Sequence, residues 1–209
     1  MMMNKNDQAS STVELRAAKI PAIGLIAVHY WFVIHQEKQT ERWEVWQKPR
    51  QNTASSSTLN SASWGHLHKN LLAFDRGVGN GDSWTETRWQ GDVAYKLIDV
   101  LRASATDYPE CHRYHYWPGP NSNTYVQWIL NQADCDHQLL PQGIGKNHQG
   151  WWGWQRAGRC TAFSTPLFGF KYIPSKYFEW HFLHLALSVQ RNPWRVRTFL
   201  KTFYGTPSL

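Results

Sequence analysis

The sequence predicts an α+β fold with a mainly antiparallel sheet and a few segregated helices. Residues 20–36 are rich in β-branched and aromatic side chains, which is typical of a long strand. Residues 92–105 instead predict a helix, because their apolar side chains recur at the spacing of one helix face. These side chains are Ala94, Leu97, Ile98 and Leu101. Further strand-like segments follow from residue 161 onward, which completes the pattern of this fold class.

The N-terminal third of the chain is expected to hold a tail, a hairpin and a loop. Residues 1–19 are polar and predict a disordered tail, which leaves residues 20–209 as a single globular domain. Residues 41–48 alternate polar and apolar side chains, so they are expected to pair with the long strand as a hairpin. Residues 49–63 are rich in Ser, Thr and Asn and predict a flexible loop. A further strand is expected within residues 63–74.

The later elements follow from the same patterns. Asp92 is a suitable N-cap for the first helix. Residues 111–117 predict a short strand, and a second helix is expected to begin just after Pro120. Strands are then expected over residues 161–165, 167–173 and 177–189. The segment 193–203 is expected to be a terminal helix or turn.

Composition limits the class of protein. Of the 209 residues, 42% are hydrophobic and 18% are charged, as in a folded globular protein. The net charge of +7 leaves binding to an anionic surface open, but the Lys and Arg residues are scattered, so nucleic-acid binding is not expected. Cys111, Cys135 and Cys160 show no C-x-x-C spacing, which argues against a zinc site and suits a reducing, cytoplasmic compartment. No metal or other cofactor is predicted, no secretory signal is evident, and the oligomeric state stays unknown.

Residues 114–130, YHYWPGPNSNTYVQWIL, join the expected short strand to the second helix. Pro120 lacks a backbone donor and disfavours helical geometry at Gly119, so the strand must end there. The next four residues are all types that cap helices: Asn121, Ser122, Asn123 and Thr124. Two interpretations stay open. The junction is an ordinary capped corner, or it presents a side chain at a helix N-terminus, where free N–H groups favour negative charge.

His29 supplies a partner for the second interpretation. It lies within an apolar strand, where a polar side chain destabilises the fold unless it is hydrogen-bonded. Such a histidine is either bonded to the backbone or paired with a nucleophile, here Ser122, as a general base. Glu44 is a candidate to orient the imidazole, and Gln47 is an equal one, because the sequence does not set the hairpin register.

Three motifs, WPGPNSNTY, AVHYW and IGKN, occur here in a characteristic order. In this combination the chain resembles a bacterial family catalogued as a domain of unknown function, number 3750. The hallmark of that family is a W-P-G-P-N-S-N-T-[FY] box with an upstream A-V-H-x-W strand and a downstream I-G-K-[DN]. The resemblance covers about residues 20–190. It implies nothing about activity, because the family is uncharacterised.

The segment NSNTYV is also similar in shape to the N-C-x-x-[FL]-V segment of circularly permuted papain-like proteins, the NlpC and lecithin-retinol acyltransferase group. In that group a His on an early strand precedes a nucleophilic Cys at a helix start. These positions correspond to His29 and Ser122 here. The resemblance implies a permuted papain-like fold. Since Ser replaces Cys, the thiolate chemistry does not carry over. Either Ser122 acts with His29 as its base, or the site binds without cleaving.

The leading hypothesis is a hydrolase or acyltransferase that acts on an amide or ester, with Ser122 as nucleophile, His29 as base and Glu44 as orienting group. The substrate would be a small molecule, a peptide or an acyl compound. Four further residues are expected to contact it: Asn121, Asn123, Trp117 and Lys146. The alternative is a non-catalytic binding or structural protein in which the PGPNSNT box is a helix-capping corner. The sequence therefore leaves open whether the protein is an enzyme.

Overall fold

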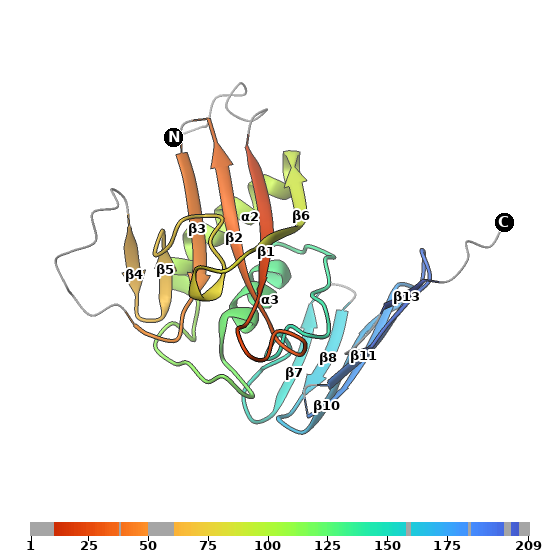
Figure 1. The fold of residues 1–209 in the computed structure, drawn as a ribbon. Helices are drawn as coiled ribbons and strands as arrows, with labels where there is room; N and C mark the ends of the chain where they lie inside the picture. Colours follow the sequence, from red (N-terminus) through yellow and green to blue (C-terminus); the bar gives the residue numbers. More distant parts are fainter. Residues whose placement is uncertain are drawn as a thin grey trace.

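Two antiparallel sheets and two α-helices form the framework of the described residues. In the computed structural model these are residues 11–37, 39–49, 61–157, 160–183, 185–198 and 202–204. The second sheet lies to one side of the first, and α3 is near the place where they meet (Figure 1). The predicted α+β class, mainly antiparallel with a few segregated helices, is confirmed.

The first sheet has six strands in the order β4-β5-β3-β2-β1-β6. Their bounds are β1 Thr12–Lys19, β2 Val28–Gln36, β3 Gln39–Val45, β4 Ala62–Trp64, β5 Leu67–Lys69 and β6 Trp84–Gln90. The β-branched and aromatic residues of β2 favour its extended backbone. Because side chains alternate along a strand, Tyr30 and Phe32 face one side of the sheet, and His29 and Trp31 face the other.

Both α-helices pack against the Tyr30 side of this sheet. α2 spans Gly91–Asp107 and contacts β1 and β6, whereas α3 spans Ser122–Gln132 and contacts β2 and β3. The apolar side chains of α2 that the spacing singled out are all buried: Ala94, Leu97, Ile98 and Leu101. Burial of each large aliphatic side chain contributes about 1.5–3 kcal/mol, so this packing holds α2 on β1 and β6. Among the described residues, neither helix has the length and apolar character needed to cross a membrane.

The segment between β5 and β6 covers the opposite face of the first sheet. It contains a short 3₁₀ turn, η1, at Val78–Asn80. In Figure 1 this segment passes in front of β2 and β3. Trp31 Nε1 donates to Phe74 O at 3.0 Å, and Arg42 Nη1 donates to Ala73 O at 2.7 Å. Trp31 and Arg42 are thereby buried almost completely, so water is kept from this face as well.

The second sheet has seven strands in the order β13-β12-β11-β10-β9-β8-β7. Their bounds are β7 Gly153–Ala157, β8 Cys160–Ser164, β9 Phe168–Ile173, β10 Tyr177–Phe182, β11 Leu185–Gln190, β12 Arg195–Arg197 and β13 Thr202–Tyr204. Strands that follow one another in the chain are neighbours in the sheet. Burial alternates along β10, where Tyr177, Glu179 and His181 are buried and the residues between them are exposed. The sheet therefore has one covered face and one exposed face.

A buried ion pair joins the second sheet to the preceding part of the chain. Lys146 Nζ lies 2.6 Å from Glu179 Oε2 and donates to Leu139 O at 3.0 Å. Asn147 Nδ2 donates to Glu179 Oε1 at 2.6 Å, and the Tyr177 hydroxyl donates to Oε2. Burial raises the pKa of Glu179, but the charge of Lys146 and these hydrogen bonds outweigh burial and hold the pKa below its usual value. Glu179 is therefore an ionised anchor inside the protein.

His137, close to this junction, makes stability depend on pH. Burial, followed by the charges of Arg197 and Lys146, lowers the pKa of His137 from 6.5 to about 4. The unfolded chain takes up a proton near pH 6.5, whereas the folded chain does so only near pH 4. Stability from this group is therefore complete above pH 6.5 and is lost as the pH falls toward 4. From this group alone, we expect the free energy of unfolding to drop by about 2 kcal/mol between pH 7 and pH 5.

Urea unfolding at the two pH values measures this drop, and His137→Gln should reduce it by that amount because the titrating group is gone. Equal pH dependence in the wild type and the variant would contradict the assignment to His137.

The structure corrects the prediction of an N-terminal tail. Residues 12–19 form β1, which pairs with both β2 and β6, whereas residues 1–10 lie outside the described residues. The charges that gave this segment a tail-like composition are paired in the sheet: Glu14 contacts Arg16 at 3.1 Å and also contacts Arg88. Polar composition therefore did not indicate exposure here.

Two further boundaries in this half of the chain differ from the prediction. The long strand begins at Val28, because residues 21–26 form turns. Of the loop predicted for residues 49–63, residues 50–60 lie outside the described part of the chain, and the last two residues belong to β4.

The predictions for the later segments were wrong at three places. The segment 177–189, predicted as one strand, forms most of the antiparallel pair β10 and β11. Residues 111–117 form turns and bends instead of a strand. Within the segment 193–203, predicted as a helix or turn, β12 and the start of β13 pair as an antiparallel hairpin. β12 pairs with β11, and β13 pairs with β12, and a local sequence pattern does not reveal these partners.

Candidate active site

The polar box predicted as a helix cap caps α3. Asn121 is the N-cap, and its Oδ1 accepts from the N–H groups of Asn123 at 2.9 Å and Thr124 at 3.3 Å. Thr124 Oγ1 in turn accepts from Asn121 N–H at 3.1 Å and donates to Gly145 O at 2.7 Å. Gly145 has a φ of +86°, and a Cβ there would lie 2.2 Å from Asn121 Nδ2. The glycine of the IGKN motif therefore lets this segment pack directly on the cap.

Asn123 fastens the start of α3 to the end of β2. Its Oδ1 accepts from Tyr30 N–H at 3.2 Å, and its Nδ2 donates to Val28 O and Ile144 O, each at 2.9 Å. These bonds satisfy backbone groups on both sides of His29. Asn123 therefore sets the position of the helix start relative to the strand that carries the histidine.

Between these two asparagines, the hydroxyl of Ser122 faces the imidazole of His29. Ser122 Oγ lies 2.9 Å from His29 Nδ1, and His29 Nε2 lies 3.2 Å from Glu44 Oε2. A weaker contact joins Ser122 Oγ to Asn123 Oδ1 at 3.4 Å. Ser122 and His29 are each 4% exposed, and Glu44 is fully buried. The structure thus brings together the three side chains singled out from the sequence as nucleophile, base and orienting group.

The charge on Glu44 decides which nitrogen of His29 carries the proton. Burial raises the pKa of Glu44, but the hydrogen bond with His29 and the charge of Arg42 outweigh burial and lower it. Arg42 Nη2 lies 2.7 Å from Glu44 Oε2. An ionised carboxylate only accepts, so His29 Nε2 must donate to it. Nδ1 of the neutral imidazole is then an acceptor, and the Ser122 hydroxyl donates to it.

A groove of about 270 Å³ runs beside Ser122 and His29. Most of the other side chains that line it are apolar or aromatic, among them Ile23, Trp46, Tyr114, Tyr116 and Ile144. The rings of Trp46 and His29 meet edge to face, with centroids 5.2 Å apart. Such a lining suits an apolar group of a ligand and leaves a few polar side chains, the serine and histidine among them, to orient it.

The other predicted site residues fall into two groups. Asn121 and Asn123 line the groove, as does the exposed Gln47, but it is Glu44 that bonds the imidazole. Trp117 and Lys146 are not among the groove-lining residues that the structure describes. Trp117 is half exposed, and Lys146 is paired with Glu179 under the second sheet.

Arg42 is the member of this hydrogen-bonded cluster that the sequence reasoning missed. It lies two residues before Glu44 on β3, so alternation places both side chains on one face of the sheet. Its guanidinium also stacks on Trp31, 4.2 Å from the ring centroid. The spacing R-x-E in a strand could have indicated this residue, because it places the arginine and the glutamate on the same face.

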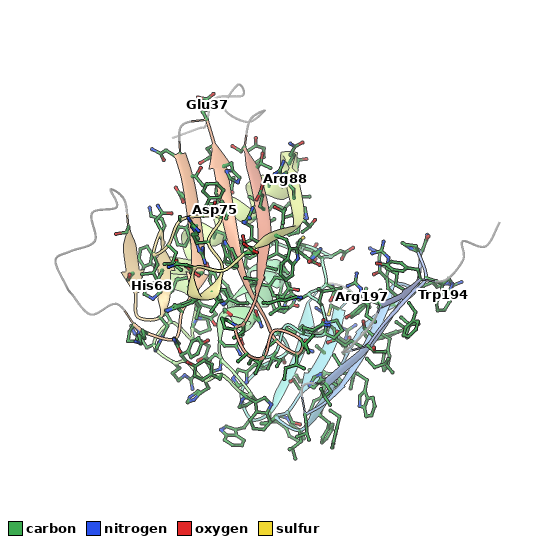
Figure 2. All side chains as sticks on the ribbon, viewed as in Figure 1. Glu37, His68, Asp75, Arg88, Trp194 and Arg197 are labelled. Atoms are coloured by element: carbon green, nitrogen blue, oxygen red, sulfur yellow. The ribbon has the colours of Figure 1, made fainter. Side chains whose placement is uncertain are left out.

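A second serine–histidine pair lies on β4 and β5. Ser63 Oγ is 2.8 Å from His68 Nδ1, and His68 Nε2 is 3.1 Å from Lys48 O. His68 is labelled in Figure 2. The backbone carbonyl of Lys48 contacts His68 Nε2, whereas the carboxylate of Glu44 contacts His29 Nε2. The pair therefore provides an internal comparison for Ser122 and His29. In the described part of the chain, no group of three or more His, Cys, Asp or Glu residues is arranged to hold a metal ion.

Residues 10–148 match the family model described as Protein of unknown function (DUF3750). The match includes Ser122, His29 and Glu44 and ends just after Lys146. It starts earlier and ends earlier than the expected range of 20–190, so the second sheet lies outside it. No curated protein and no solved structure matches the chain.

Proposed function

We propose, from the premise that this chain belongs to the family of proteins of unknown function DUF3750, that it is a hydrolase or acyltransferase that acts on an ester or amide. The observation that carries the proposal is the hydrogen-bonded series Ser122–His29–Glu44 beside an apolar groove. Ser122 is the nucleophile, His29 the general base, and Glu44 a positioning residue held by Arg42.

The first step forms a bond between Ser122 Oγ and the carbonyl carbon of the substrate. The hydroxyl proton passes to His29 Nδ1, and the electron pair of the C=O bond moves to the oxygen. Glu44 stabilises the imidazolium because its charge lies at the other ring nitrogen. When the intermediate collapses, the bond to the leaving alcohol or amine breaks, and His29 returns its proton to that group. Water or a second acceptor then attacks the acyl-serine and gives its proton to His29. The bond between the acyl carbon and Ser122 Oγ breaks, and His29 returns the proton to Oγ.

The start of α3 supports the negative charge that develops on the carbonyl oxygen. Ser122 is the first residue of the helix, and Asn121 accepts from the N–H groups of Asn123 and Thr124 but not from that of Ser122. An N–H at a helix N-terminus favours an adjacent anion. The order of the groups along the chain, a strand histidine followed by a nucleophile at a helix start, also supports kinship with the permuted papain-like group.

The same proposal includes a cytoplasmic location and no cofactor. Cys111, Cys135 and Cys160 are free thiols, which supports a reducing compartment. Acyl transfer through a serine uses groups that the chain itself supplies. The apolar lining of the groove supports a substrate that carries an apolar acyl or side group.

A fluorophosphonate probe tests the proposal, since it reacts covalently with an activated serine. We expect the wild type to be labelled once, at Ser122, and Ser122→Ala to lose the label. Ser63→Ala is the matched control, because Ser63 also contacts a histidine Nδ1, and this variant should label like the wild type. Intact-mass and peptide mass spectrometry measure the extent and the position. An unlabelled wild type, or a label that persists in Ser122→Ala, would contradict the proposal.

The second candidate function is a binding protein that uses the same groove without covalent chemistry. The observation that favours it is that Asn121, Asn123 and Thr124 are all committed to backbone hydrogen bonds at the corner. On this alternative the wild type stays unlabelled while an apolar ester still binds, and Ser122→Ala binds it equally well.

A further inference from the structure

The outward face of the second sheet is a broad exposed apolar surface. Six of its side chains, each between 43% and 51% exposed, are Phe168, Tyr172, Phe178, Trp180, Phe182 and Leu187. Side chains on this side of the blue strands project away from the first sheet in Figure 2. Strand pairing sets these residues next to one another, since Phe178 lies opposite Tyr172 and Trp180 opposite Leu187. A monomeric protein rarely leaves so many contiguous large apolar groups in water, so this apolar face indicates a binding surface.

The apolar face continues around one end of the sheet. The loop before β7 and the hairpin connections β8–β9 and β10–β11 meet at this end. They carry exposed apolar side chains: Trp151 at 86%, Trp152 at 75%, Leu167 at 55% and Leu183 at 45%. A flat surface made only to meet another flat surface would not need apolar side chains on its end loops. The apolar end instead suits insertion into a medium that surrounds it.

Charge identifies that medium. Residues 149–209 contain eight Lys and Arg residues and one acidic residue, Glu179, so this segment carries the entire net charge of +7. The remaining residues, 1–148, hold fourteen basic and fourteen acidic residues and balance to zero. Glu179 is buried and paired with Lys146. Lys176, which pairs with the exposed Asp136, and Arg191 are exposed at the end of the sheet opposite to the apolar end. The sheet therefore presents an apolar end and a basic end.

We propose that the second sheet docks the protein onto the surface of an anionic lipid bilayer. Aromatic side chains are favoured at the boundary between acyl chains and headgroups, and basic residues are attracted to anionic headgroups. The charged side chains in the described part of β8–β11, Lys171 and Glu179, are buried on the other face, so none of them opposes insertion. The apolar end enters the acyl region, and Lys176 and Arg191 meet the headgroups.

Two other partners fit less well. A second copy of the chain would bring two segments of charge +7 together, which is electrostatically unfavourable. A single-stranded nucleic acid would stack on the aromatic rings. It would gain nothing from the aliphatic groups Leu167, Leu183 and Leu187, and within β8–β11 no described basic residue faces outward beside the rings to meet its backbone.

Vesicle co-sedimentation tests the proposal on the full chain. The probes are vesicles of phosphatidylcholine alone and of phosphatidylcholine mixed with phosphatidylglycerol. We expect the wild type to bind the mixed vesicles at least about tenfold more strongly than the neutral ones. Trp180→Glu should weaken binding by at least about tenfold, because it places a charge in the inserted face. The double variant Trp151→Ser/Trp152→Ser changes two exposed loop residues, so it should not disturb the fold. We expect it to weaken vesicle binding to a similar extent.

The matched control is Val93→Glu, at an exposed apolar position of α2, and it should bind like the wild type. Wild-type protein that stays in the supernatant with both vesicles overturns the proposal. So does vesicle binding that neither variant of the sheet weakens. Light scattering that shows a dimer dissociated by Trp180→Glu would assign the apolar face to a second copy instead. Vesicle binding does not depend on the labelling of Ser122, so this test can fail or succeed independently of the proposed function.

Discussion

Replacing His29 with glutamine is expected to slow fluorophosphonate labelling of Ser122 by about 10²–10⁴-fold, the usual contribution of a general base. Glutamine is close in size to histidine and can still accept from Ser122 and donate to Glu44. The fold should therefore survive, with the midpoint of urea unfolding close to that of the wild type. The amide cannot take up the hydroxyl proton at neutral pH, so the nucleophile loses its activation. The measurement is the second-order rate constant of labelling, followed by intact mass.

His68→Gln is the control for this substitution. His68 makes the same Nδ1 contact with Ser63 but meets a carbonyl on its other nitrogen, so the change should leave the labelling rate of Ser122 unaltered. The labelling rate of Ser122 in Glu44→Gln should lie between the rates in His29→Gln and His68→Gln, because an uncharged amide no longer holds the proton on His29 Nε2. If His29→Gln reacts as fast as the wild type, His29 is not the base and the proposed chemistry fails.

Replacing Lys146 with methionine is expected to lower the free energy of unfolding by about 3–5 kcal/mol. The side chain of Glu179 is 1% exposed, and without the ammonium group its charge is left buried and uncompensated. The wild-type pKa of Glu179 is lowered, so its contribution is present above pH 4.5 and is lost as the pH falls through the folded-state pKa. The loss in Lys146→Met should therefore be largest at neutral pH and shrink in acid. Urea unfolding across this pH range measures it.

Lys176→Met is the matched control. Lys176 pairs with Asp136 across the same two parts of the protein, but both side chains are more than half exposed. Exposed pairs contribute about 0–1 kcal/mol, so this variant should be nearly as stable as the wild type. The double variant Lys146→Met/Glu179→Gln should recover most of the lost stability, because no unpaired charge remains. Equal losses in Lys146→Met and Lys176→Met would contradict a special role for the buried pair.

The sequence predicted elements well where the pattern itself decides burial. The helix expected over residues 92–105 lies within α2, because one apolar stripe is enough to orient a helix on a sheet. The capped helix after Pro120 was predicted for a similar reason, since N-capping is local chemistry. β1 was missed because its residues become strand-like only through long-range pairs, such as that between Glu14 and Arg88. Propensity cannot register a partner that lies far away in the chain.

The candidate site was predicted in part for the same reason. His29 was visible as a polar residue inside an apolar strand, and Ser122 as one of several capping residues at a junction. Glu44 could not be separated from Gln47, because the hairpin register decides which side chain reaches the imidazole. Lys146 was assigned to the ligand on motif position alone, yet its ammonium group lies beside Glu179. The apolar groove gathers side chains from five separate segments, which no local pattern combines.

Arg42 contacts both the connection between β5 and β6 and the carboxylate of Glu44. Its guanidinium donates to Ala73 O and to Arg76 O at 2.5 Å, and it also holds the carboxylate of Glu44. The closing of the β5–β6 connection over the sheet is therefore coupled, through one guanidinium group, to the alignment of the Glu44 carboxylate behind His29. On the proposed chemistry, Ser122 is unreactive in a chain in which this closure has not yet formed. Reactivity of Ser122 would therefore require that the connection between β5 and β6 has closed over the sheet.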